Sequence, residues 1–387
     1  MRKLLQPGRQ VDELRLLVDA DDVVGGGEPL GHGLQGVRAV EIMGLDDDVH
    51  VGQRRAEGRL QDVDLRALGV DHHQHTLPRE RLEAVRLELA ANDDARTLIM
   101  NTVAPIWDGN ETWLVMGGIG LFAAFPIAFA IIIPAMYFPI LIMLLGLIFR
   151  GVAFEFRLKA HKSRFLWDHA FSWGSLVATF AQGIVLGAFV QGFEVRDGQF
   201  AGTVYDWARP FPLLVGVGLV FGYVLLGSTW LVIKTEGSIQ LWAVKWARIA
   251  LIGVVAFIAM VSIWTPLSDP KIAARWFTWP NLGYLAPLPI ATGAIVLWLW
   301  RSLDKGRDIV PFFGAIGLFA MCFLGLGISL WPNIVPPSIS LWEAASSPRA
   351  QAFLLIGTLF LLPIIIMYTG WSYYVFRGKV RADTGYH

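Results

Sequence analysis

The sequence has very little cysteine, and its first part has no aromatic residues. Cys322 is the single cysteine among 387 residues, which excludes an intrachain disulfide. All of the 16 Trp, 8 Tyr and 24 Phe residues follow position 106, and the first hundred residues contain no serine. A segment with so few large apolar side chains buries too little surface to offset the entropy of its chain. The first part of the chain is therefore not expected to form a packed core of its own.

The charges are also divided unevenly. The net charge is zero, but residues 1–100 carry 13 Lys and Arg against 19 Asp and Glu, whereas residues 101–387 carry 19 against 13. We interpret residues 1–95 as an atypical acidic segment and residues 96–380 as the main domain. The segment is either a disordered extension or the product of translation in a wrong reading frame. An apolar helix of about twenty residues encoded upstream in another frame would support the second explanation.

Two features of the acidic segment invite assignments that we do not adopt. The stretch from Asp71 to His75 holds three histidines, which are common zinc and copper ligands, but we expect a solvated or spurious segment there. Residues 1–5 lead into Gln, Arg and Asp rather than into an apolar core, so a signal peptide is not expected.

The remainder of the chain is strongly apolar. Hydrophobic residues make up 55% of the sequence, and the mean hydropathy is +0.51. A helix needs about twenty apolar residues to cross the hydrocarbon core of a membrane. Runs of that length lie at approximately 113–133, 135–155, 169–191, 211–233, 243–264, 283–300, 310–330 and 352–376. They lack the alternation of barrel strands, so we predict an all-α polytopic membrane protein with eight recognisable spans.

Basic residues fall on alternate connections between these spans. Short loops that carry Lys and Arg stay in the cytoplasm. The basic residues are Arg157, Lys159 and Lys162, then Lys234, Lys245 and Arg248, then Arg301, Lys305 and Arg307, and finally Arg377, Lys379 and Arg381. We therefore predict a cytoplasmic C-terminus, and we place residues 100–111 on the same side. For Arg157 and its neighbours we favour an ordinary basic loop.

Several residues within the spans predict how the helices meet. The pairs Gly183/Gly187 and Gly218/Gly222 each place small residues on one helix face, which lets helices approach closely. Gln182 and Gln191 could form hydrogen bonds between helices. Three prolines are expected to kink or separate helices rather than to mark a site, namely Pro126, Pro134 and Pro363.

Histidine is scarce where a redox cofactor would need it. A haem held by two histidines requires imidazoles on facing helices within the membrane. After residue 100 only His161, His169 and His387 remain, and none lies in the middle of a span. We therefore expect no metal ligand set and no haem bound by this chain alone.

The strongest polar motif is WDGNETW at residues 107–113, which begins the first span. Asp108, Asn110 and Glu111 could form a hydrogen-bonded path for protons at the membrane boundary. They could equally cap a helix, because Asp and Asn accept bonds from free amides and acidic residues favour the positive end of a helix. Spacing alone leaves both explanations open. The flanking Trp107 and Trp113 are expected to have structural roles.

Three charged residues lie near the ends of the second and third spans. Arg150 and Glu155 close the second span, and Asp168 opens the third. Charged groups near lipid are costly and normally paired. We therefore expect Arg150 to meet an acidic residue of this chain or of a partner, and we assign Glu155 and Asp168 to structural or interface roles.

Four stretches resemble the subunit II family of cytochrome bd ubiquinol oxidases. These are MNTVAPIWDGNETWLV at 100–115, LIFRGVAFEFR at 147–157, GSTWLVIKTEG at 227–237 and SLWEAASSP at 340–348. The resemblance runs from about residue 91 to 379, and it leaves open whether the chain is of a cyanide-insensitive branch. The family has nine helices, arranged as two four-helix bundles and one peripheral helix. The atypical segment 1–95 stands where the family has its first transmembrane helix.

The resemblance implies a heterodimer in a bacterial inner membrane. A haem-bearing subunit I would hold b-type and d-type haems, oxidise quinol and reduce oxygen to water. This chain would support assembly and cytoplasmic proton uptake, with Asp108 matching the aspartate that the family assigns to a proton path. A structural quinone, a small accessory subunit, lipid and the quinol pool are further expected contacts, and nucleic acid is not. The alternative from another class is a secondary transporter, whose substrate would bind at mid-membrane between repeats, or another polytopic membrane scaffold.

Overall fold

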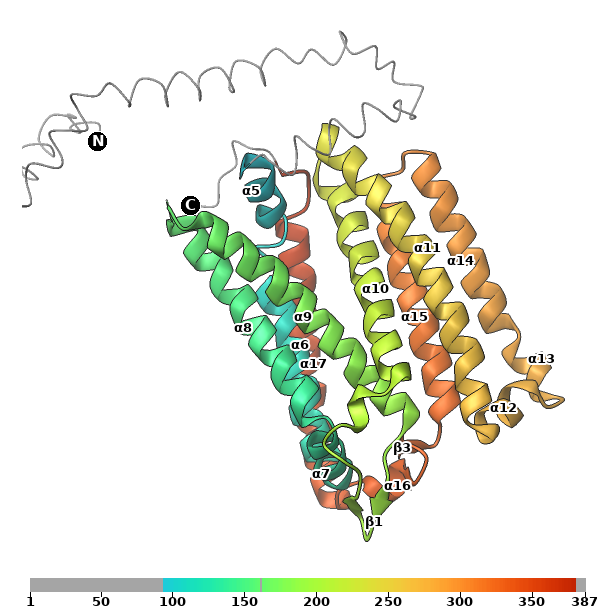
Figure 1. The fold of residues 1–387 in the computed structure, drawn as a ribbon. Coiled ribbons are helices and arrows are strands. Elements are labelled where there is room, and N and C mark those ends of the chain that lie inside the picture. The colour runs from blue at the N-terminus through green and yellow to red at the C-terminus, as the bar shows by residue number, and fades with distance from the viewer. Residues whose placement is uncertain (1–92, 161, 381–387) are drawn as a thin grey trace, which may run out of the picture. The chain divides into compact units, whose positions relative to one another are not determined.

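The computed structural model describes residues 93–160 and 162–380, and the chain there is almost entirely helical (Figure 1). The atypical segment 1–95 lies outside the described residues apart from residues 93–95, and so does the histidine-rich stretch at 71–75. Residues 93–95 begin helix α5 (Asp93–Asn101), which precedes the first apolar helix.

Seven helices in the described part of the chain are long and apolar enough to cross a membrane. Six of them are α8 (Tyr137–Lys159), α9 (Arg164–Gln191), α10 (Pro210–Lys234), α11 (Gly237–Ser268), α15 (Val310–Leu330) and α17 (Pro348–Val375). The seventh crossing, Asn281–Asp304, joins the short α13 (Asn281–Leu285) to α14 (Pro287–Asp304). The expected all-α polytopic architecture is confirmed.

The expected first span, 113–133, is divided in the structure. Helix α6 (Trp107–Ala124) ends at Phe125, and Pro126 begins helix α7 (Pro126–Ala135). Proline fits the first position of a helix because its missing N–H would have no partner there. The carbonyl of Ala124 accepts hydrogen bonds from the Ser346 backbone at 2.9 Å and from the Gln351 side chain at 2.7 Å. The segment that opens α17 therefore stabilises the interruption.

The long helices form two groups. Helices α10, α11, α14 and α15 pack around an apolar core to which all four contribute, including Leu225, Leu251, Leu299 and Leu318. The other group contains α6, α7, α8, α9 and α17 (Figure 1). Helices α6 and α17 bury no residue completely within the chain, so their apolar faces are exposed.

The two groups meet along α9 and α10, whose backbones approach closely. A Cβ atom added to Gly183 would lie 2.6 Å from the Cα of Gly216, and one added to Gly187 would lie 2.6 Å from the Cα of Pro212. The expected close approach at Gly183 and Gly187 is confirmed. Directly before Gly183, Gln182 Oε1 accepts a hydrogen bond from the Tyr223 hydroxyl of α10 at 2.8 Å, which confirms a bond between helices for Gln182.

One end of the molecule, which we call the basic end, gathers the C-terminal ends of α8, α10, α14 and α17 (Figure 1). The basic residues that predicted orientation lie toward this end, except Arg381, which lies outside the described residues. The opposite end carries short elements. These are β1 (Val195–Arg196) with β2 (Gln199–Phe200), η1 (Asp206–Ala208), α12 (Pro270–Phe277), β3 (Asn333–Val335) with β4 (Ile339–Ser340), and α16 (Leu341–Ala344). Helix α7 packs there against β3, α16 and the end of α9 through a shared apolar core.

Candidate functional site

The candidate site begins at the first turn of α6, on the basic end. Helix α6 starts at Trp107 because the chain turns at Ile106, and no side chain caps that start. Neither Asp108 nor Asn110 therefore accepts a capping hydrogen bond at the start of α6, which the capping explanation of the motif required. Asp108 and Asn110 are exposed, whereas Glu111 is partly buried. Positions 108 and 111 are one turn apart on one helix face.

Glu111 faces Arg150 of α8. Glu111 Oε1 and Arg150 Nη2 are 3.7 Å apart, and both side chains are about three-quarters buried. The contact confirms the expectation that Arg150 meets an acidic residue. It is a loose pair, because Glu111 Oε1 and Arg150 Nε are both buried without a hydrogen-bond partner among the described residues. Buried polar atoms of this kind are rare and costly in folded proteins.

Trp107 holds the start of α6 against α8. Its ring stacks on that of Phe154, with centroids 5.1 Å apart and planes inclined by 16°. The ring also covers Gly151, where an added Cβ would meet it at 3.3 Å. The glycine thus leaves room for the indole directly after Arg150. Trp113 is partly buried two turns farther along α6.

Asn110 connects the same turn to the last helix. The Tyr373 hydroxyl of α17 donates to Asn110 Oδ1 at 3.3 Å, and the Tyr373 ring lies edge-on to that of Trp230 of α10. The short polar motif of α6 therefore contacts α8 and α17, two helices that lie far apart in the sequence, and reaches α10 only through Tyr373. Tyr373 carried no sequence signal, because an aromatic residue near the end of a span is typical of membrane helices in general.

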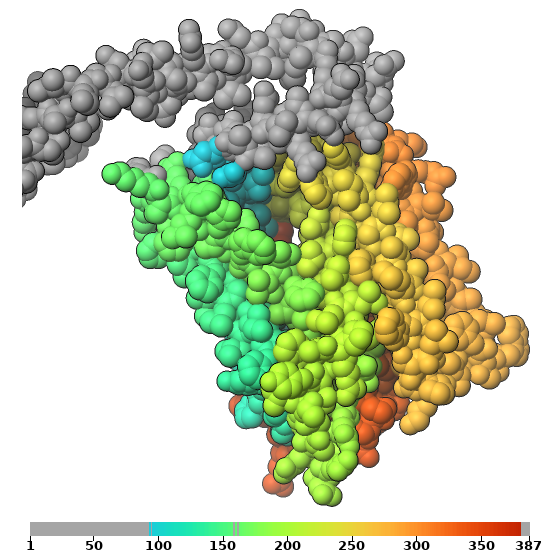
Figure 2. Space-filling view, in the orientation of Figure 1, coloured from blue at the N-terminus to red at the C-terminus, as the bar shows by residue number. Residues whose placement is uncertain are grey.

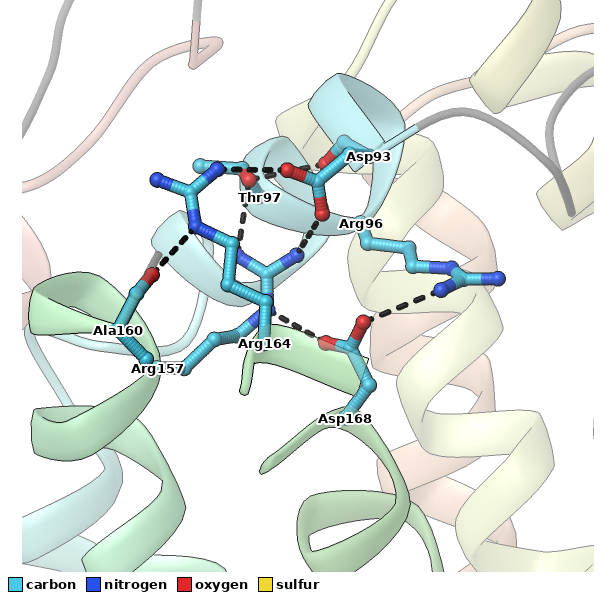
Figure 3. A network of polar contacts seen from close by, with 7 residues as sticks. All are labelled: Asp93, Arg96, Thr97, Arg157, Ala160, Arg164 and Asp168. Atoms are coloured by element: carbon cyan, nitrogen blue, oxygen red, sulfur yellow. Dashed lines mark hydrogen bonds and ion pairs between the residues drawn. The ribbon is translucent and has the colours of Figure 1, made fainter. Parts of the chain in front are cut away.

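The structure places Glu155 and Asp168 away from this turn. Glu155 lies on the exposed side of α8 and pairs with Lys159 at 3.9 Å, in an ordinary contact between successive turns. Asp168 lies on α9 and belongs to a separate polar network at the basic end (Figure 3).

That network corrects the interpretation of Arg157 as part of an ordinary basic loop. Arg157 is 1% exposed. Its guanidinium donates to Asp168 Oδ1 at 2.5 Å, to Asp93 Oδ1 at 2.7 Å and to the Thr97 hydroxyl at 2.9 Å. The physical reason is that α5 covers the end of α8 and removes Arg157 from solvent. Lys159 and Lys162 remain exposed, as expected of a loop at the membrane boundary.

Two further arginines complete the network. Arg164 donates to Asp93 Oδ2 at 2.8 Å and to the carbonyl of Ala160 at 2.9 Å, and Arg96 pairs with Asp168 at 3.1 Å (Figure 3). The space-filling view shows α5 lying against the ends of α8 and α9 (Figure 2). The network therefore fixes α5, and with it the linker that leads into the first turn of α6.

The described residues offer no pair of histidines for a haem. His169 is the only histidine in 93–160 and 162–380, and it lies exposed near the start of α9, edge-on to Phe165. No group of three or more His, Cys, Asp or Glu residues in that part of the chain could hold a metal ion. Haem ligation in proteins uses axial side chains such as His, Cys, Met or Tyr inside a pocket. Here the single imidazole lies at the end of the bundle instead.

Comparisons with known proteins agree on one family. The sequence model described as cytochrome bd terminal oxidase subunit II matches residues 83–376. Cytochrome bd-I ubiquinol oxidase subunit 2 of Escherichia coli strain K12 is 28% identical over 334 residues, with 76% of this chain and 87% of that protein covered. Cytochrome bd ubiquinol oxidase subunit 2 of Bacillus subtilis strain 168 is 30% identical over 308 residues, with the same coverage.

A solved structure supports the fold. A chain of the bd oxidase from Geobacillus thermodenitrificans superposes with a TM-score of 0.59 and 18% sequence identity. The superposition covers 76% of this chain and 90% of that chain. At this level of identity the likeness concerns the arrangement of the helices and not the roles of single residues.

Proposed function

The chain belongs to the family of cytochrome bd terminal oxidase subunit II, and we propose that its Asp108 and Glu111 take up protons for the oxidase at the basic end of the bundle. Membership makes the chain a subunit of a quinol-oxidising, oxygen-reducing enzyme. It also decides between the two functional classes that the sequence left open, in favour of the oxidase subunit over the secondary transporter.

The observation that carries the proposal is the environment of Glu111. Its carboxylate is partly buried one turn into α6, and its Oε1 makes no hydrogen bond among the described residues. A carboxylate held only by a 3.7 Å ion pair can accept a proton without breaking a short hydrogen bond. Asp108 is exposed one turn before Glu111 on the same helix face. The pair thus provides two successive proton acceptors at increasing depth.

The proposal includes an orientation. Reduction of oxygen to water consumes protons, and the family resemblance implies that they come from the cytoplasm. The basic end carries the Lys and Arg residues of the alternate connections, which favour the cytoplasmic side. We therefore place the basic end, the C-terminus and the first turn of α6 on the cytoplasmic side of a bacterial inner membrane.

The proposal also includes a partner. The scarcity of histidine in the described residues supports b-type and d-type haems held by a subunit I rather than by this chain. The exposed apolar faces of α6 and α17 are available for subunit I and lipid. The assembled oxidase draws on the quinol pool. We assign no residue of this chain to a structural quinone or to a small accessory subunit.

The proposal is tested by replacing Asp108 with Asn in the complex formed with subunit I. Quinol oxidation per haem is expected to fall about tenfold or more, while the haem spectra stay unchanged, because a proton acceptor is lost but the packing is kept. Glu155→Gln is the matched control, since Glu155 is an exposed carboxylate at the same end of the molecule. It is expected to leave turnover unchanged.

The opposite result would assign a structural role to Asp108. If Asp108→Asn lowers the haem content of the complex while turnover per remaining haem equals that of the unsubstituted oxidase, the residue supports assembly and not proton uptake. Equal losses of turnover in Asp108→Asn and Glu155→Gln would likewise contradict a specific path through α6.

A further inference from the structure

A cavity of about 330 Å³ opens at the basic end, apart from the Glu111 carboxylate and its arginine. Its walls come from the linker between α5 and α6, the end of α10, and the end of α17 with the segment that follows it. The residues that matter here are Thr102, Ile106, Trp230, Lys234, Arg377 and Lys379. Three of these six carry a positive charge.

The cations are held by carbonyl groups more than by carboxylates. Lys234 is 4% exposed, and its ammonium donates to the carbonyls of Phe376 and Gly378 while lying 4.9 Å from the centre of the Trp230 ring. Lys379 donates to the carbonyl of Thr235 at 3.0 Å. These bonds attach the segment after α17 to the end of α10.

Only one of the three cations has a carboxylate partner among the described residues. Lys379 pairs with Asp308 at 2.7 Å. Arg377 lies over the ring of Tyr374 at 3.9 Å and donates to the Tyr374 carbonyl, and neither it nor Lys234 forms an ion pair with a carboxylate of residues 93–160 or 162–380. The cavity is therefore lined by two positive charges that the described carboxylates do not balance.

Of these two cations Lys234 is buried and Arg377 is exposed, so Lys234 bears most of the cost of a charge without a counter-charge near a membrane. The carbonyls at the ends of α10 and α17 offset part of that cost. The offset is incomplete, because each helix end carries only about half a negative charge. An anionic ligand in the cavity would balance the remainder. The cavity is thus electrostatically suited to an anion, and its apolar wall at Ile106 and Val375 suits the carbon chain of an amphiphile.

The position of the cavity identifies the kind of anion. Lys234 ends one membrane-spanning helix, and Arg377 follows the end of another by two residues. Basic pockets between helices at this depth bind the phosphate groups of lipids. We propose that the cavity binds a phosphate group, in the form of an anionic phospholipid headgroup seated against Lys234, Arg377 and Lys379. Free inorganic phosphate has the same chemistry, and the experiment below separates the two sources.

The test uses the purified complex with subunit I, depleted of lipid and examined by native mass spectrometry. Phosphatidylglycerol and phosphatidylcholine of matched chain length are added in separate samples. The complex is expected to retain phosphatidylglycerol preferentially, and Arg377→Gln is expected to weaken that retention about fivefold, because one charge near the headgroup is removed. Lys234 is left intact because it also holds the segment after α17.

Arg301→Gln is the matched control, since Arg301 is an exposed arginine in the last turn of α14 at the same end and does not line the cavity. Its retention of phosphatidylglycerol is expected to equal that of the unsubstituted complex. Equal retention of the two lipids, or equal losses in Arg377→Gln and Arg301→Gln, would overturn the proposal. Binding of inorganic phosphate that depends on Arg377, without any preference for phosphatidylglycerol, would replace the lipid by the free ion and overturn the headgroup assignment.

Discussion

The guanidinium of Arg157 lies between the carboxylates of Asp93 and Asp168, at 2.7 Å from the first and 2.5 Å from the second. Because Arg157 is almost completely buried, this contact differs from the exposed ion pairs at the surface of the protein. It joins α5, α8 and α9 through residues that are up to 75 positions apart. The position of α5, and of the linker that follows it, depends on this arginine.

Replacing Arg157 by Gln is expected to destabilise the complex by about 3 kcal/mol, because breaking a buried ion pair leaves charges without partners. This loss of stability lies at the lower end of the usual range for a buried ion pair, because Asp93 is 45% exposed and water screens its charge. The thermal midpoint of the purified complex measures the effect. Lys159→Gln, at a residue of which the side chain is 82% exposed, is the control. Equal midpoints for the two variants would show that the network contributes nothing to stability.

Gly183→Ala is expected to destabilise the packing of α9 on α10 by about 1–3 kcal/mol, because its Cβ would lie 2.6 Å from the Cα of Gly216 and force the backbones apart. Gly227→Ala on α10 is the matched control, since an added Cβ there meets no atom within 4 Å. Alanine favours a helix over glycine, so the control is expected to be neutral or slightly stabilising. The midpoints of thermal unfolding compare the two, and a neutral Gly183→Ala would contradict the close contact.

Glu111 and Arg150 are expected to act as a unit in turnover. Glu111→Gln and Arg150→Gln should each slow quinol oxidation per haem, and the double variant should be slowed about as much as the more affected single variant, because the second substitution removes a group whose partner is already lost. The four enzymes are compared in one double-mutant cycle. If the two losses multiply, the residues act independently and the 3.7 Å contact has no role in proton uptake.

The long helices could be predicted from the sequence because the length and apolar composition of each stretch decide whether it can cross a membrane. The interruption at Phe125 could be predicted only in part. Pro126 is compatible with both a kink and a break, and the break is stabilised by Ser346 and Gln351, which bind the freed carbonyl from more than 200 residues away. Contacts between distant segments leave no periodic signal in either one.

The candidate site could also be predicted only in part, because local chemistry is visible in the sequence and contacts between distant segments are not. The polar motif at 107–113 and the need of Arg150 for an acidic partner follow from local chemistry, and the structure pairs that arginine with Glu111. The burial of Arg157 could not be predicted, because an exposed arginine and a buried one cannot be told apart within a basic stretch of sequence. Its burial depends on Asp93, which comes from a segment whose composition predicted no packed structure.

The glycine contact between α9 and α10 also bears on energy conservation. Where the backbone of Gly183 touches that of Gly216, the gap is too narrow for a water molecule, which needs a cavity of about 10–15 Å³ and several polar neighbours. A chain of waters cannot thread between the helices there. If the basic end takes up protons as proposed, the contact at Gly183 is a dry point at which they cannot leak between α9 and α10 toward the opposite end and dissipate the respiratory gradient.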